Sequence, residues 1–192
     1  MVLKSDSQIK KKNCRTPFVL DDDSDKDNIQ DFMMYNSKYK GSLVLDSFYD
    51  SEVELNDKEE LILEGMMDST MSIFELYDID SDSDKCRIYL KDLLKPGSYE
   101  VINLGFSQSG VVGYIFCTRL IKIDKGIYMT SGSTFLFDSD KKDRLLADYS
   151  FEKLKQRRNL TSEELFILCN KKSKLYGKRV KHLDLSGNGE SF

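Results

Sequence analysis

Residues 72–137 constrain the fold most, because apolar and polar side chains alternate along them in segments that short polar turns separate. A period of two is typical of β-strands with one buried face. The pattern predicts strands over residues 72–79, 86–90, 99–104, 111–123 and 127–137. Short strands joined by such turns favour a five- to six-stranded antiparallel meander or a small open barrel. Residues 41–49 supply a further short strand or an extended lead-in.

Two turns between these segments have specific chemistry. In the first, Pro96 presets its own φ, and Gly97 is able to adopt a positive φ. In the second, Asp124, Lys125 and Gly126 predict a tight hairpin. Residues 105–110 lie between two predicted strands, and we interpret them as a loop.

Helices are predicted before and after the strands in the sequence. Asn56 and Glu59 have the spacing of a capping box, which predicts that a helix begins at Asn56 and precedes the sheet. Thr161 and Glu164 form a second such pair after the sheet, and another helix is expected to begin near Asp140. The sequence therefore predicts an α+β fold with one helix before the sheet and two after it.

The chain divides into four parts by composition. Residues 1–40 combine a lysine run with five aspartates between positions 21 and 27, so we expect them to be acidic and poorly ordered. Docking of the apolar residues 32–35 on the body as a short helix is the alternative. Residues 41–138 are expected to form the antiparallel β domain with one helix, and residues 139–182 a basic helical pair. Residues 183–192 are expected to form a flexible tail.

Composition points to a cytoplasmic protein without a cofactor. Hydrophobic residues make up 40% of the chain, which is enough for a core, yet no segment has the apolar length of a membrane span or of a signal peptide. Cys14, Cys86, Cys117 and Cys169 lack the spacing of metal ligands or redox motifs, so we expect reduced thiols. The abundance of Lys, Asp, Ser and Ile and the scarcity of Pro indicate a microbial source with an AT-rich genome.

The distribution of charge gives the clearest functional signal. Residues 1–149 carry a net charge of −9, whereas residues 150–182 carry +7. The basic residues of the second segment are Lys153, Lys155, Arg157, Arg158, Lys171, Lys172, Lys174, Lys178, Arg179 and Lys181. Such a cluster is able to contact the phosphate backbone of a nucleic acid or an acidic partner protein. Lysines also favour helix C-termini for their own sake, because they complement the helix dipole.

Two motifs resemble ligand sites but lack residues that those sites need. Residues 78–84 contain alternating aspartates, yet Ser83 and Tyr89 stand where a calcium loop needs a glycine and a bidentate glutamate. Residues 105–110 have the glycine spacing of a phosphate-binding loop, but Val111 and Val112 follow in place of Lys and Ser or Thr. We therefore predict no metal site and no nucleotide site.

Residues for catalysis are sparse. The only histidine is His182, in the basic tail, so every histidine-dependent triad would require it. Asp46, Asp50, Glu52 and Glu54 form an acidic group that leaves open a hydrolase acting through carboxylates and a metal ion. Spaced carboxylates are also common on solvated surfaces, and we predict no catalytic residue.

Three segments together suggest a family. They are Phe74-Glu75-Leu76, the run at 88–101 with its Leu-Lys-Asp-Leu-Leu turn, and the strand from Gly113 towards Arg119. This pattern resembles a β-rich module of largely uncharacterised prokaryotic proteins, some of which end in a cysteine-rich metal-binding tail. The chain has no such tail, and Tyr114 stands where the module usually has an acidic residue. The resemblance implies a sheet and names no activity.

These observations favour a non-catalytic intracellular binding or regulatory protein that engages a macromolecular partner, most simply another protein. Tyr89, Tyr99, Phe106, Tyr114 and Phe116 would supply contact area where they reach the surface. One alternative is a nucleic-acid-binding protein that uses the basic C-terminal helices. The other alternative is the carboxylate- and metal-dependent hydrolase. No membrane association is expected, and the oligomeric state is left open.

Overall fold

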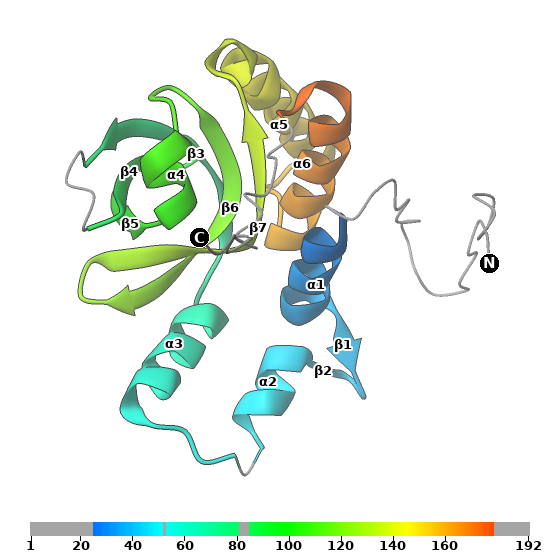
Figure 1. Ribbon diagram of the computed structural model, residues 1–192. Helices are drawn as coiled ribbons and strands as arrows, with labels where there is room; N and C mark the ends of the chain where they lie inside the picture. The colour runs from blue at the N-terminus through cyan, green and yellow to red at the C-terminus, as the bar shows by residue number, and fades with distance from the viewer. Residues whose placement is uncertain (1–24, 52, 81–84, 179–192) are drawn as a thin grey trace, which may run out of the picture.

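Five strands form the centre of the computed structural model, which describes residues 25–51, 53–80 and 85–178. In chain order they are β3 (Met71–Ile79), β4 (Arg87–Asp92), β5 (Ser98–Ile102), β6 (Ile115–Asp124) and β7 (Ile127–Phe137). They pair in the order β3-β4-β5-β7-β6, and β6 also pairs with β3, so the sheet curls round into a small barrel (Figure 1). The predicted strands are confirmed, with shifts only at their ends.

One pair of neighbouring strands differs from the predicted antiparallel meander. β5 and β7 are parallel, with Glu100 opposite Ile127. The reason lies in the connection after β5, which we predicted as a loop and which forms the short helix α4 (Leu104–Ser109). Beyond α4 the chain pairs as β6 with β3, and the predicted hairpin at Gly126 then returns β7 to the edge of β5. The predicted α+β class is confirmed.

Both faces of the sheet are buried along most of β3 and β6. The interior of the barrel holds Phe74, Leu76, Ile88, Leu90, Val101, Phe116, Leu120 and Leu136. The outer face packs against α5 (Lys142–Gln156) and α6 (Ser162–Tyr176) and buries Met71, Ile73, Ile115, Cys117, Phe135 and Phe137. Burial on both sides explains why β3 and β6 are rich in apolar residues on each face.

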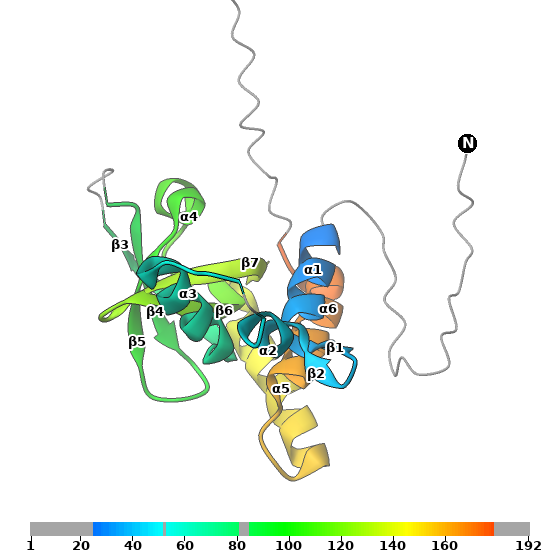
Figure 2. The same cartoon turned by 90° about the horizontal axis from the view of Figure 1, so that it is seen from below.

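The remaining elements lie at the N-terminal end of the chain. α1 (Asp25–Asn36) packs on β7, and α3 (Asp57–Met67) packs on β6. Between these helices the strands β1 (Lys38–Tyr39) and β2 (Ser42–Leu43) form a hairpin, and α2 (Val44–Tyr49) follows. Figure 2, which looks at the molecule from below, shows α2 and α3 side by side at the front of the view.

Both predicted capping boxes are present. The side chain of Asn56 accepts hydrogen bonds from the backbone amides of Lys58 and Glu59, and Glu59 accepts from the Asn56 amide at 2.9 Å. Thr161 and Glu164 make the same reciprocal pair at the start of α6. These local contacts fix where α3 and α6 begin.

The N-terminal part of the chain differs from two of our expectations. Residues 1–40 were expected to be poorly ordered, but α1 forms within them because Phe32 packs on Phe166, with ring centroids 5.3 Å apart. Residues 1–24 lie outside the described part. Residues 41–49 were expected to be extended, but only β2 is, because positive φ angles at Lys40 and Gly41 close the β1–β2 hairpin and α2 then buries Leu45.

The ends of the two closing helices also differ in detail. A single 3-10 turn at Ser139–Lys141 precedes α5, so the helix begins after Asp140 and without a side-chain cap. Arg157 adopts the left-handed conformation at the end of α5, with φ of 57°. The expected flexible tail at 183–192 lies outside the described residues.

Candidate functional site

The basic residues of the C-terminal segment mostly make ion pairs within the fold. The pairs are Lys155–Glu152, Arg158–Glu164, Lys172–Asp148, Lys174–Asp25 and Lys178–Asp138, with N–O distances from 2.6 to 3.6 Å. Lys153, Arg157 and Lys171 take part in no ion pair within the part of the chain that the structure describes, and Arg179 and Lys181 lie outside it. Much of the positive charge is therefore balanced internally.

Lys172 belongs to a network that joins α5 to α6. Its Nζ lies 2.6 Å from Oδ1 of Asp148, and the hydroxyl of Tyr176 donates to Oδ2 of the same carboxylate at 2.6 Å. Arg144 stacks over the Tyr176 ring at 4.3 Å. Burial opposes the ionisation of Asp148, but the hydrogen bonds from Lys172 and Tyr176 outweigh it and lower the pKa of that carboxyl. The network accounts for Lys172 as a structural residue.

The carboxylates that suggested a hydrolase do not converge. Asp46 lies in α2, Asp50 follows that helix, and Glu54 lies in the link to α3, whereas Glu52 falls outside the described residues. Among the residues that the structure describes, no three His, Cys, Asp or Glu side chains are grouped so as to hold a metal ion. His182 also lies outside the described part.

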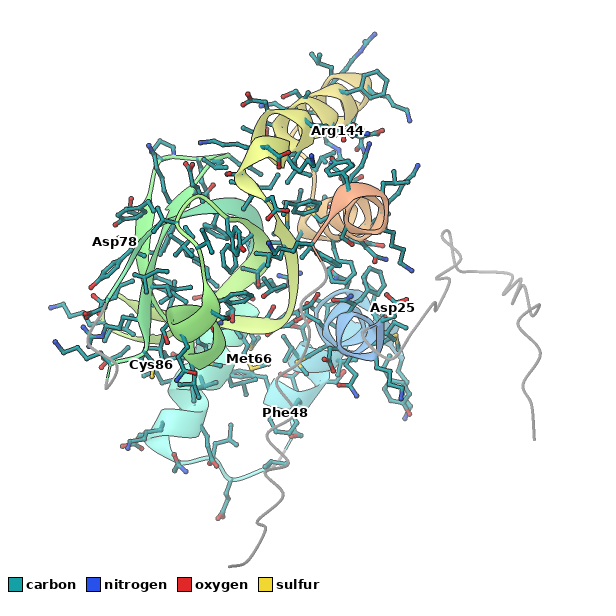
Figure 3. The ribbon with its side chains drawn as sticks, turned by 45° about the horizontal axis from the view of Figure 1, so that its top comes forward. Asp25, Phe48, Met66, Asp78, Cys86 and Arg144 are labelled. Atoms are coloured by element: carbon teal, nitrogen blue, oxygen red, sulfur yellow. The ribbon has the colours of Figure 1, made fainter. Side chains whose placement is uncertain are left out.

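The surface formed by α2, α3 and their link is both apolar and acidic, and we call it the α2–α3 face. Phe48, Tyr49 and Val53 are 44%, 49% and 52% exposed there. The other large exposed apolar side chains of this face are Val44, Leu61, Ile62 and Met67. Residues 44–68 contain nine acidic residues and a single lysine. Figure 3 shows Phe48 at the outer edge of the molecule.

Local packing explains why these side chains remain outside. α2 has six residues and buries Leu45, while α3 buries Leu63 against Ile121 of β6 and brings Gly65 against the same strand. Among the described residues, the apolar side chains on the other sides of these two helices stay exposed. The face is therefore a consequence of two short helices that each use one narrow side for docking.

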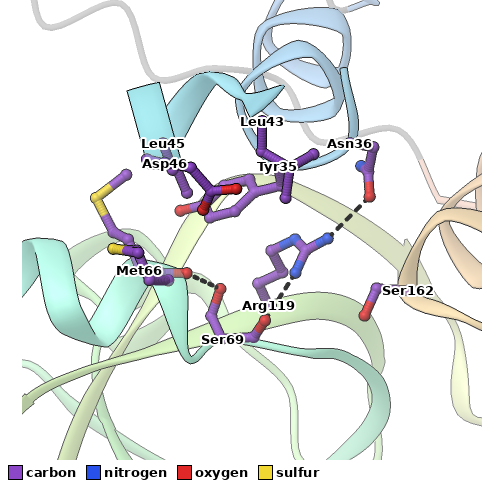
Figure 4. A pocket seen from close by; sticks show the side chains of 10 residues that line it. Tyr35, Asn36, Leu43, Leu45, Asp46, Met66, Ser69, Arg119 and Ser162 are labelled. Carbon is purple, nitrogen blue, oxygen red and sulfur yellow. Dashed lines mark hydrogen bonds between the residues drawn. The ribbon is translucent and has the colours of Figure 1, made fainter. Parts of the chain in front are cut away.

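A pocket of about 210 Å³ opens beside this face and has Arg119 of β6 in its wall, and we call it the Arg119 pocket. Figure 4 shows Arg119 beneath Tyr35 of α1, with Asp46 of α2 beside the Tyr35 ring. The other residues around the pocket are Asn36, Leu43, Leu45, Met66, Met67, Ser69 and Ser162. Polar groups thus meet the apolar side chains of α2 and α3 in a small concave space.

Arg119 is only 4% exposed, yet no described carboxylate forms an ion pair with it. Its Nη1 donates to the carbonyl oxygen of Ser69 at 2.9 Å, and its Nη2 donates to Oδ1 of Asn36 at 3.3 Å. The guanidinium stacks on the Tyr35 ring at 4.4 Å. Burial lowers the pKa of Arg119, while the charge of nearby Asp31 opposes that effect.

Two further ionisable side chains near Arg119, those of Asp31 and Tyr35, are also buried. Burial raises the pKa of Asp31, although a hydrogen bond from Ser131 and the charge of Arg119 act against it. Burial and the charge of Asp31 raise the pKa of Tyr35 to about 12, so the phenol stays neutral. The arginine is thus held by neutral partners and by one carboxylate at a distance.

Two nitrogen atoms at this pocket have hydrogens but no acceptor within the described structure. They are Nε of Arg119 and Nδ2 of Asn36, and both atoms are buried.

A family model matches residues 8–182 of the chain, and its description is a family of unknown function, DUF7986. The chain belongs to the DUF7986 family. No curated protein and no solved structure matches it. The α2–α3 face and the Arg119 pocket both lie within the matched part of this DUF7986 protein.

Sequence reasoning did not select the pocket of the DUF7986 protein. Arg119 entered only through the family resemblance, and Tyr35 and Asn36 lie in the segment expected to be poorly ordered. One usable signal exists, because Arg119 is the only charged residue between Ile115 and Ile121. A lone arginine in an apolar strand needs buried partners. No helix among the described residues has the length and apolar character to cross a membrane.

Proposed function

We propose that this DUF7986 protein is a non-catalytic binding or regulatory protein that engages a partner protein through the α2–α3 face. The observation that carries the proposal is the group of exposed apolar side chains among the carboxylates of residues 44–68. Large apolar and aromatic side chains gathered on one surface are typical of protein interfaces. Phe48 and Tyr49 are the natural anchors, since buried aromatic residues commonly dominate binding energy.

The charge of the face defines the chemistry of the partner. Residues 44–68 contain nine acidic residues and one lysine. This charge favours a partner whose own surface is basic as well as apolar, such as an amphipathic helix with Lys and Arg on its flanks. Opposite charges accelerate association and make it sensitive to salt. The same charges repel phosphate groups, so this face disfavours nucleic acid.

The nucleic-acid alternative has less support. It relies on the basic C-terminal segment, where Lys155, Arg158, Lys172, Lys174 and Lys178 each pair with a carboxylate. A lysine or arginine that is paired with a carboxylate must give up that partner before it neutralises a phosphate, which would weaken the interaction. The hydrolase alternative also has less support, because the described carboxylates at 46, 50 and 54 form no metal-binding group.

A capture experiment with a matched control tests the proposal. The full chain and a double variant, Phe48→Ser with Tyr49→Ser, are used as bait in lysate from the native host. The control is Phe151→Ser with Leu154→Ser, which removes apolar residues of α5 that are even more exposed, at 66% and 76%. Circular dichroism establishes that each variant is folded.

The expected result is a protein that the native chain and the α5 control retain, that the Phe48 and Tyr49 variant loses, and that salt releases. Its binding should be reproduced with purified components. Capture that is equal for all three baits, or lost equally in both variants, would contradict an interface at the α2–α3 face.

A further inference from the structure

We propose that the end of α5 binds the surface of a membrane that contains anionic lipids, with Phe151 and Leu154 entering the headgroup layer. The site comprises residues 151–158, the last part of α5 and the start of its turn into α6, and we call it the α5 tip. A contact of this kind lies on one face of the bilayer and needs no membrane span. The proposal goes beyond the α2–α3 interface and does not depend on it.

The α5 tip exposes two large apolar side chains. Phe151 is 66% exposed, and Leu154 is 76% exposed, the highest value for a large apolar residue in the described part of the chain. The two residues stand three positions apart in a helix, so they share one side of it. That side faces away from Leu145, which α5 buries in the core against the sheet. An aromatic and an aliphatic side chain on the outer side of a helix are typical of an interfacial membrane contact.

Positive charge accompanies these side chains. The α5 tip contains one acidic residue, Glu152, and four basic residues, all of them exposed: Lys153, Lys155, Arg157 and Arg158. Lys153 and Arg157 form no ion pair with any described residue. The tip therefore keeps positive charge that the rest of the basic segment uses in internal pairs. Each such charge near an anionic bilayer strengthens binding by about fivefold.

The helix dipole explains only part of this arrangement. Lys153 and Lys155 lie in the last turn of α5, where cations are favoured in any helix. The dipole gives no reason for Phe151 and Leu154 to be exposed at the same end. A surface that is basic and apolar together fits lipid headgroups, which combine negative charge with an apolar layer beneath.

The position of the tip also suits a flat and extended ligand. Figure 2 shows the end of α5 and its turn into α6 projecting from the lower edge of the view. A standard protein interface buries roughly 800 Å² on each side and needs a broad surface, whereas a bilayer accepts a projecting tip. Figure 3 shows α5 along the upper edge of the molecule and Phe48 of the α2–α3 face at the lower edge. A tip bound to anionic lipid would therefore leave the acidic α2–α3 face pointing away from the membrane.

The test is cosedimentation of the purified full chain with lipid vesicles. One set of vesicles is phosphatidylcholine alone, and the other is phosphatidylcholine mixed with an equal amount of phosphatidylglycerol. We expect the chain to sediment with the mixed vesicles and not with the neutral ones. Binding should fall as salt is added, because salt screens the attraction between the tip and the headgroups.

A first double variant tests the apolar part of the contact. Phe151→Ser with Leu154→Ser should weaken binding to the mixed vesicles by about tenfold or more, because both side chains lose their burial in the bilayer. Phe48→Ser with Tyr49→Ser is the matched control, since it removes two exposed apolar residues from the α2–α3 face. This control should bind the vesicles as the native chain does.

A second double variant tests the charge. Lys153→Gln with Arg157→Gln should weaken binding by about tenfold or more. The control is Lys91→Gln with Lys125→Gln, which removes the same charge from exposed positions of the barrel and should have little effect. Circular dichroism establishes that all four variants are folded.

A fluorescent reporter distinguishes entry into the bilayer from a contact through charge alone. The chain contains no tryptophan, so one introduced residue gives the whole signal. Emission of Leu154→Trp should shift to shorter wavelength with the mixed vesicles, because the indole leaves water. Val111→Trp, exposed between α4 and β6, is the control and should not shift.

Four results would overturn the proposal: no sedimentation with the mixed vesicles, equal binding to the neutral vesicles, binding that Phe151→Ser with Leu154→Ser leaves intact, or unchanged emission of Leu154→Trp. Tight binding of a mixed-sequence DNA duplex together with the third result would assign the basic residues to nucleic acid instead. The vesicle assay uses the purified chain alone, so failure of partner capture at the α2–α3 face leaves it unaffected, and the reverse also holds.

Discussion

Gly65 of α3 lies directly against the carbonyl oxygen of Lys122 in β6, so closely that a Cβ at position 65 would overlap that oxygen. The contact joins backbone to backbone, so no side-chain rotation relieves it. It sets the distance at which α3 docks on the barrel, and α3 in turn supplies Met66 and Met67 to the Arg119 pocket.

Replacing Gly65 with Ala should therefore destabilise the protein. The methyl group forces α3 away from β6, and overpacking of this kind costs about 1–3 kcal/mol, which exceeds the roughly 1 kcal/mol that Ala gains over Gly in a helix. Urea denaturation followed by circular dichroism measures the free energy of unfolding. Gly105→Ala in α4 is the matched control, because a Cβ there meets only an ordinary contact at 3.7 Å, and it should be neutral or stabilising.

Arg119 should be irreplaceable by lysine for the stability of the fold. Lysine keeps the charge but loses the fork that reaches both Ser69 and Asn36 and the stacking on Tyr35. We expect Arg119→Lys to lower the free energy of unfolding by about 2–3 kcal/mol, since a buried charged group loses hydrogen bonds.

Arg144 provides the control for that change. It stacks on Tyr176 at nearly the same distance, 4.3 Å, but at an exposed position. Arg144→Lys should cost less than about 1 kcal/mol, because exposed cation–π contacts are weak. If urea denaturation gave equal losses in the free energy of unfolding for the two variants, burial would not make the Arg119 contacts stronger than the exposed Arg144 contact.

Acid should destabilise the first turn of α6, because Glu164 loses its negative charge there. Hydrogen bonds from Arg158 lower the pKa of this carboxyl from 4.5 to about 2 in the folded chain. Because the folded pKa is depressed, the stabilisation is complete above pH 4.5 and is lost as the pH falls towards 2.

The comparison that isolates this effect uses Glu164→Gln, in which glutamine preserves the capping box but has no charge. The difference in melting temperature between the native chain and this variant should be largest near neutral pH and should shrink as the pH falls towards 2. Glu163→Gln, at an exposed neighbouring position, serves as control. A difference that stays constant with pH would mean that the Arg158 contact adds no stability.

Features that depend on neighbours in sequence were predictable. Both capping boxes need residues three positions apart, and the Gly126 hairpin needs only its own turn residues. The alternation within β3 and β7 likewise follows from one strand at a time.

Features that depend on distant segments were not predictable. The parallel β5–β7 pair depends on where β6 leaves the barrel edge, and Lys174 meets Asp25 across 149 positions of sequence. The Arg119 pocket combines α1, α2, α3 and β6, which no local pattern brings together. The basic C-terminal segment therefore looked available as a binding surface until its internal carboxylate partners were known.

The three described cysteines should differ in their reactivity towards alkylating reagents. Cys117 and Cys169 are buried free thiols, and burial together with the neighbouring Cys169 raises the pKa of Cys117 well above its usual range. Only the thiolate is nucleophilic, so Cys117 should remain unmodified in the native protein. Cys86 is half-buried, lies immediately before β4 and should react first of the three. Mass spectrometry after iodoacetamide treatment at pH 8 measures the order, and urea should make all three sites equally reactive. Rapid native labelling of Cys117 would show that the contact between β6 and α6 opens readily.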